Sequence, residues 1–128
     1  FITEAGYYMT LPDLDFIPGA AVMTRVISHP AKGVFTTDLG YKAIASDPAG
    51  QRGYIVGLED AVPIIHSEEH WAFRLEDESR IPAIGSCLYV ISTHICPTTA
   101  LYPEILVAKD GQVADRWQVT ARNRRITY

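Results

Sequence analysis

The sequence predicts an all-β fold, a mainly antiparallel β-barrel or β-sandwich with at most short helical turns. Three observations support this prediction. Short runs of β-branched and aromatic residues recur along the chain, turn residues bound most of them, and no helical segment of 10–15 residues separates them. The chain has 128 residues, of which 48% are hydrophobic and 20% charged, as in ordinary globular proteins. We therefore expect residues 1–128 to form a single β domain.

The expected strands follow from the composition and alternation of eight segments. In chain order the segments are 20–28, 33–37, 53–57, 61–65, 70–75, 86–93, 104–108 and 112–120. Segment 28–33 predicts a turn, and segment 41–47 is the one plausible helical turn, which Pro48 would end. Between the last two strands, Asp110-Gly111 predicts a tight hairpin, because both residues tolerate a positive φ.

The charge and cysteine content exclude several classes of protein. The net charge of −4 gives no electrostatic reason to expect nucleic acid or an anionic membrane as partner. No run approaches the roughly 18 apolar residues of a membrane span. Two cysteines, Cys87 and Cys96, are too few for a disulfide framework, so a cytoplasmic location is expected. The chain begins at Phe1 without an initiator methionine, which indicates a piece of a longer protein.

The segment STHICPT carries a candidate metal site. If the strand before it continues, His94 and Cys96 project to the same side, because side chains alternate with period two. Imidazole and thiolate are good ligands for zinc and similar metals. The same pair is also compatible with a buried thiol beside a hydrogen-bonded histidine. A closed structural zinc site needs four protein ligands, so a metal bound here would keep open positions, as catalytic metals do.

A second cluster lies in the segment HSEEHWAF. Along an extended strand, His66, Glu68 and His70 would share one face, with Glu69 and Trp71 on the other. Such a cluster could bind metal, orient a proton-transfer group or solvate the end of a strand. The sequence contains no glycine-rich phosphate loop, GxSxG, HExxH or CxxC motif. The residues alone therefore indicate a β domain with an open metal site as one possibility.

Three stretches in this order resemble a known family: TTDLGYKAIASD, then HSEEHW, then STHICPTTALYPE followed by DGQVADRWQVTARNR. They resemble the C-terminal β domain of D-threonine aldolases and eukaryotic-type D-serine dehydratases. Those enzymes belong to the alanine racemase-like, fold type III enzymes that use pyridoxal phosphate. The resemblance extends from EAGYYMT to TARNR, and the HxCPT block with the DG.V.DRW pattern is its most specific part.

The resemblance implies that two domains contribute different parts of the active site. In the family a TIM barrel carries pyridoxal phosphate on a lysine, and the β domain closes over it with a divalent metal, zinc or manganese. The matching metal ligands here are His94 and Cys96, and His70 would be a catalytic residue facing the same active site. Trp71 stands where the family pattern favours glycine. None of the three lysines has the context of the cofactor lysine, so the barrel is expected to be a partner outside this chain.

The implied function is that of a lyase acting on D-β-hydroxy amino acids, as D-threonine aldolase or D-serine dehydratase. Pyridoxal phosphate is an electron sink, and a Lewis-acid metal would polarise the substrate β-hydroxyl group. Cysteine rather than aspartate as the second ligand favours the dehydratase branch, but bacterial proteins called D-threonine aldolases also carry it, so both reactions stay open. Two alternatives stay open: a pyridoxal phosphate-dependent racemase relative without metal, and a standalone β domain that binds a metal or a partner. By analogy with the family, a homodimer is also expected.

Overall fold

The computed structural model of the protein describes residues 2–11, 13–47 and 49–127. Within these residues the chain forms eight strands, two short α-helices and two 3-10 turns. The strands are β1 (Val22–Ala31), β2 (Val34–Thr37), β3 (Gly53–Ile55), β4 (Val62–His66), β5 (Trp71–Arg74), β6 (Cys87–Ser92), β7 (Glu104–Lys109) and β8 (Gln112–Gln118). The helices are α1 (Ala5–Thr10) and α2 (Ile95–Thr99), and the 3-10 turns are η1 (Glu78–Arg80) and η2 (Thr120–Asn123).

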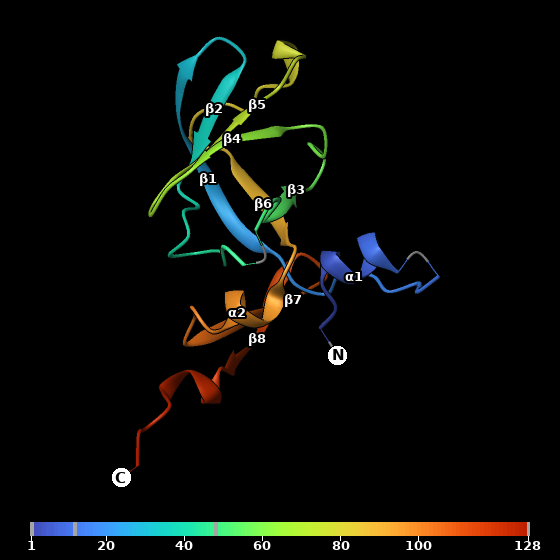
Figure 1. Cartoon of the computed structure of the whole chain (residues 1–128), viewed down its shortest axis with the longest axis vertical. Coiled ribbons are helices and arrows are strands. Elements are labelled where there is room, and N and C mark those ends of the chain that lie inside the picture. Colours follow the sequence, from blue (N-terminus) through green and yellow to red (C-terminus); the bar gives the residue numbers. More distant parts are fainter. Residues whose placement is uncertain (1, 12, 48, 128) are drawn as a thin grey trace.

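Six of the strands form one antiparallel sheet in the order β3-β6-β1-β2-β5-β4. The sheet curls into a half-barrel, and the β7–β8 hairpin and α2 lie beyond its lower end (Figure 1). Each of the eight segments expected from the sequence overlaps one of these strands. The prediction of an all-β fold with only short helices is therefore confirmed.

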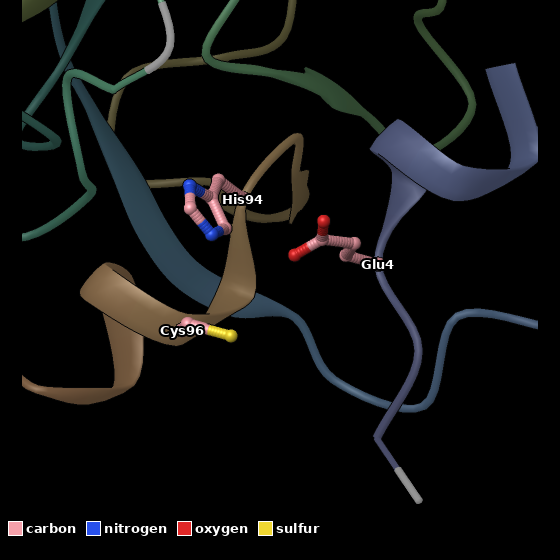
Figure 2. Close-up of side chains that lie close together, drawn as sticks. All are labelled: Glu4, His94 and Cys96. Carbon is pink, nitrogen blue, oxygen red and sulfur yellow. The ribbon is translucent and has the colours of Figure 1, made fainter. Parts of the chain in front are cut away.

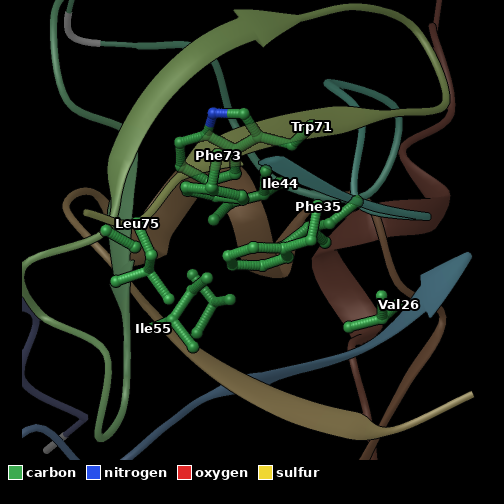
Figure 3. Close-up of a cluster of buried hydrophobic side chains, with 10 residues drawn as sticks. Val26, Phe35, Ile44, Ile55, Trp71, Phe73 and Leu75 are labelled. Atoms are coloured by element: carbon green, nitrogen blue, oxygen red, sulfur yellow. The ribbon is translucent and has the colours of Figure 1, made fainter. Parts of the chain in front are cut away.

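The concave side of the sheet holds the hydrophobic core (Figure 3). In β5 the side chains of Trp71 and Phe73 point inward, because alternate residues of a strand face the same side. The ring of Phe73 lies 4.6 Å from that of Trp71 and 5.5 Å from that of Phe35, measured between centroids. Truncating any of these three aromatic side chains to alanine would cost about 3–5 kcal/mol, a large part of the stability of a small domain.

Strand β1 is longer than the sequence indicated. We expected a turn over residues 28–33, but β1 continues through Ala31, where it still pairs with Val34 of β2. Two irregularities in the register of this ladder accommodate the extra residues. The turn is therefore confined to Lys32 and Gly33, and the φ of Gly33 is 71°.

Segment 41–47 forms one helical turn and then an irregular loop. The backbone N–H of Ile44 donates to the carbonyl of Gly40, as in an α-helix, but no helix follows. The N–H of Lys42 instead donates to the carbonyl of Glu68 in the β4–β5 turn. A Cβ on Gly40 would lie 2.0 Å from that carbonyl oxygen, so glycine is required at this crossing. The loop is thereby anchored to the sheet.

The β7–β8 hairpin has the tight turn predicted from Asp110-Gly111, with φ values of 51° and 76°. Its side chains are mostly exposed, including Val113 and Trp117. Among the described residues, no helix is long and apolar enough to span a bilayer.

Candidate metal centre

The candidate centre forms where β6 ends and α2 begins. The shared face of His94 and Cys96 required the strand to continue through them, but β6 ends at Ser92 and α2 starts at Ile95. Pro97 explains the change, because proline lacks the N–H that a strand ladder uses but fits the first turn of a helix. His94 is the N-cap residue of α2 and Cys96 lies in its first turn. The expected strand geometry at this point is therefore wrong.

The N-terminal segment supplies a third donor group. Glu4 precedes α1, and its Oε2 accepts a hydrogen bond of 2.7 Å from the backbone N–H of Ile95. Two residues away in each segment, the N–H of Gly6 donates to the carbonyl of Thr93 at 3.1 Å. A Cβ on Gly6 would lie 2.6 Å from that carbonyl oxygen, so the close approach of the two segments depends on glycine.

The three side chains Glu4, His94 and Cys96 converge on one point (Figure 2). One ligand atom from each lies within 4.8 Å of the ligand atoms of the other two. Bond lengths of about 2.0–2.3 Å in tetrahedral zinc sites place ligand atoms roughly 3.5 Å apart, so the three side chains would move closer together on binding a metal. Among the described residues, this is the one group of three or more histidine, cysteine or acidic side chains with such proximity.

The imidazole of His94 is oriented by a second carboxylate. Its Nδ1 lies 3.3 Å from Oδ2 of Asp47, at the end of the loop that follows Gly40. In this arrangement Nδ1–H donates to the carboxylate, and Nε2 keeps its lone pair for a metal. Histidine ligands of metals commonly carry such a carboxylate on their other nitrogen. Asp47 therefore belongs to the surroundings of the candidate centre.

Helix α2 is fixed to the loop that carries Asp47 by two side chains. The buried hydroxyl of Thr98 donates to the carbonyl of His94 at 2.9 Å and accepts from the N–H of Ala45 at 3.2 Å. The phenol of Tyr102 donates to the carbonyl of Ala43 at 2.7 Å. Burial raises the pKa of Tyr102, so the phenol remains a donor. These contacts hold the two sides of the candidate centre together.

A turn separates the residues of the second cluster that we expected from the sequence. His66 ends β4 and Trp71 begins β5, and the residues between them form the hairpin turn. The predicted alternation of His66, Glu68 and His70 on one face is therefore wrong. The imidazole of His66 packs 4.7 Å from the Trp71 ring, and desolvation lowers its pKa. His70 is exposed and is not part of the three-residue group, so the structure does not bring His70 together with His94 and Cys96.

The other charged residues around this turn pair with one another. The ammonium group of Lys42 lies 2.8 Å from Glu69 and 2.9 Å from Glu68. Hydrogen bonds to Glu69 and Glu68 raise the pKa of Lys42 well above its ordinary value. This turn is therefore an exposed ion-pair cluster joined to loop 40–47.

Cys87 is an exposed thiol away from the candidate centre. It begins β6 opposite Arg25 of β1, and its side chain is exposed. Alternation in β6 places Val90 and Ser92 inward instead. Both cysteines are free and exposed, but only Cys96 has other potential metal ligands beside it among the described residues.

The sequence does not indicate Glu4 as a potential ligand. It lies 91 residues before Ile95, and no short motif joins the two. The segment TEAGYY has no metal-ligand spacing of its own. Only the docking of the N-terminal segment onto the β6–α2 junction brings the carboxylate to His94.

Comparisons with known proteins place these residues in a family. The sequence matches the family described as putative serine dehydratase domain over residues 19–108. An uncharacterized protein of Mycobacterium tuberculosis is 31% identical over 115 residues, which cover 88% of this chain and 86% of that protein. D-threonine aldolase of Arthrobacter sp. is 30% identical over 104 residues, which cover 79% of this chain and 26% of the aldolase.

Solved structures share the fold. The crystal structure of D-threonine aldolase from Filomicrobium marinum superposes with a TM-score of 0.84 at 24% identity, over 94% of this chain and 33% of that chain. D-threo-3-hydroxyaspartate dehydratase from Delftia sp. HT23 superposes with a TM-score of 0.61 at 26% identity, over 77% of this chain and 31% of that chain. The chain thus spans about a third of each of these solved structures. With most of its length matched, it belongs to the putative serine dehydratase domain family.

Proposed function

We propose that this chain is the metal-binding β domain of a pyridoxal phosphate-dependent lyase that acts on D-β-hydroxy amino acids. The activity would be that of a D-threonine aldolase or a D-serine dehydratase, with His94 and Cys96 as ligands of a divalent metal, zinc or manganese. The observation that carries the proposal is the convergence of these two donors with a carboxylate at the β6–α2 junction. The homology to D-threonine aldolase supports the choice of reaction.

The donor set fits a divalent metal of the borderline class. An imidazole nitrogen and a thiolate sulfur favour zinc over magnesium or calcium, which prefer oxygen ligands. Cys96 is exposed and His94 is half-buried, so a substrate atom could reach a metal between them. Bound there, the metal would supply Lewis-acid polarisation of the substrate β-hydroxyl group. In this proposal His94 presents Nε2, Asp47 fixes the ring, and Cys96 contributes its sulfur.

The lysines of this chain do not fit a covalent pyridoxal phosphate site. A Schiff base needs an unprotonated amine, but two carboxylates hold the Lys42 ammonium group and raise its pKa. Lys32 is exposed and pairs with Glu78 at 3.1 Å. The cofactor would therefore be bound by a TIM-barrel partner domain, and this chain would contribute the metal centre. His70 is the residue we propose to face the substrate from the β4–β5 turn.

The ligand assignment can be tested on the purified chain by zinc content after equilibrium dialysis. His94→Ala and Cys96→Ala should each lower zinc affinity by at least about tenfold, because each removes a side chain that would bind the metal directly. Cys87→Ala is the matched control, since it removes the other exposed thiol without touching the centre. Equal zinc binding by all four proteins would refute the assignment. In a polypeptide that also carries the barrel, the same two ligand variants and His70→Ala should lose cleavage of D-threonine or elimination of D-serine.

The mycobacterial relative favours a second candidate function. The match covers 86% of that protein, which leaves little room there for a barrel domain. A standalone β domain that binds a metal or a partner without catalysing a reaction is therefore the alternative for this chain. Co-purification with a barrel-containing polypeptide, or an in-frame barrel encoded upstream of Phe1, would favour the lyase. Isotope exchange at Cα without cleavage at Cβ would instead indicate a racemase relative.

A further inference from the structure

We infer that Glu4 is the third protein ligand of the metal centre, and that metal binding therefore fastens the N-terminal segment to the β6–α2 junction. The inference rests on the proposed metal-binding function of His94 and Cys96. It adds an oxygen donor to a site that otherwise has one nitrogen and one sulfur donor. It also assigns a role to the segment that precedes the residues matched by the family.

Two hydrogen bonds fix the position of the Glu4 carboxylate, one to its side chain and one from the backbone of its segment. Its Oε2 accepts the backbone N–H of Ile95, which lies between His94 and Cys96 in the chain. The backbone of the same segment is held by the hydrogen bond from Gly6 to Thr93. The carboxylate therefore lies close to both the imidazole and the thiol (Figure 2).

The carboxylate has coordination capacity left after this hydrogen bond. An ionised carboxylate has about four lone-pair sites, and the Ile95 amide uses one of them. A ligand oxygen of Glu4 lies within 4.8 Å of the ligand atoms of His94 and Cys96. Three protein ligands with one open position is the usual composition of catalytic zinc sites. Glu4 would thus complete the protein part of the site and leave room for one substrate oxygen.

One substitution can distinguish a role of Glu4 as a metal ligand from a purely structural role. Glu4→Gln keeps a carbonyl oxygen that can accept the Ile95 N–H, but a neutral amide is a poor ligand for zinc-like metals. A second variant, Gly6→Ala, leaves all three donors intact and pushes a Cβ against the Thr93 carbonyl. Glu76→Gln is the matched control, because it removes one exposed carboxylate just after β5 that is not part of the Glu4, His94 and Cys96 group.

The experiment is a titration of the 128-residue chain with Co²⁺, followed by absorption of the thiolate-to-cobalt charge-transfer band and by competition with Zn²⁺. We expect one bound ion in the wild type, with affinity reduced by about 10–100-fold in Glu4→Gln and in Gly6→Ala. The charge-transfer band should persist at saturation in both, since Cys96 is retained. Zn²⁺ should also slow amide exchange of residues 3–10 in the wild type, and much less in Glu4→Gln.

The possible outcomes distinguish this inference from the function on which it rests. Wild-type affinity in Glu4→Gln, with the charge-transfer band present, would overturn the role of Glu4 and leave the His94–Cys96 centre intact. Absence of the band in the wild type would overturn the centre itself, and the inference with it. A loss of affinity in Glu76→Gln equal to that in Glu4→Gln would attribute the effect to net charge, and would also overturn the inference.

Discussion

Two carboxylates, those of Asp47 and Glu4, lie near the imidazole of His94, and we expect them to have different roles. Asp47 contacts Nδ1 and sets the tautomer and orientation of the ring. Glu4 is held by the backbone amide of Ile95, and one of its oxygens lies within 4.8 Å of a nitrogen of the same imidazole, where it would be a ligand in the centre that we propose. One histidine thus links the loop after Gly40 to the N-terminal segment. A substitution of Asp47 would loosen the ring, whereas one of Glu4 would remove a donor.

His66 is a residue whose burial gives a prediction about pH. Its Nε2 has no hydrogen-bond partner among the described residues, and desolvation lowers its pKa below the ordinary value of 6.5. The unfolded state therefore binds a proton more readily than the folded state as the pH falls below about 6.5. The stability contributed by neutral His66 is present above that pH and is lost as the pH falls through the lower, folded-state pKa.

Melting temperatures measured between about pH 7.5 and about pH 5 would test this expectation. The wild type should lose stability on acidification, and His66→Phe, which keeps a ring against Trp71, should show a shallower slope. His70→Phe removes an exposed imidazole from the same hairpin and serves as the control. Identical slopes in the wild type and His66→Phe would contradict the proposed cause.

At the scale of elements, the five-residue helix α2 depends on tertiary contacts rather than on helix propensity. Its buried Thr98 hydroxyl bridges the His94 carbonyl and the Ala45 N–H. Because Ala45 is also buried, its N–H would have no water to replace a lost partner. The hydroxyl is therefore important for both the fold and the candidate centre.

Thr98→Val should reveal this dependence, because valine has nearly the same shape but no hydroxyl. We expect the free energy of unfolding to fall by about 1–3 kcal/mol in urea titrations, with an unchanged m value. Zinc affinity should fall as well, since the His94 carbonyl and α2 lose their anchor. Thr99→Val, at the next position of the same helix, should change both quantities much less. Equal effects of the two substitutions would show that the bridge is unimportant.

The elements were predictable to different degrees. All eight strands follow from alternation and β-branched composition, which are local properties of segments such as those of β5 and β6. The switch from strand to helix at Ile95 was not predicted, because β-branched residues on both sides favoured extension. The β4–β5 turn was also missed, since no glycine or proline marks the sequence HSEEHW.

At the scale of the whole molecule, the chain is similar to 26% of one D-threonine aldolase sequence and to 33% of the chain in one D-threonine aldolase structure. This predicts that the isolated chain folds but binds pyridoxal phosphate at no specific lysine. Borohydride reduction of the chain with pyridoxal phosphate, followed by peptide mapping, should give at most scattered labelling of Lys32, Lys42 and Lys109. D-serine and D-threonine should remain unchanged. Stoichiometric labelling of one lysine together with lyase activity would show that the chain is a complete enzyme.

The candidate centre was predictable only where its residues are neighbours in sequence. His94 and Cys96 were found because two good ligands stand two positions apart. Glu4 and Asp47 reach the same point from distant positions, at the N-terminus and in the loop after Gly40. Their convergence is a property of the folded chain, and no spacing rule connects them.

The hydrogen bond between Glu4 and Ile95 joins residues that are 91 positions apart, one before the six-stranded sheet and one after its last strand in the chain. Closing so long a loop costs chain entropy that local hairpins do not, so this contact should form after the β1–β2 and β4–β5 pairings. The metal centre would then be assembled at the end of folding. An ion captured there would slow unfolding more than it speeds folding, because its ligands come together only after the transition state.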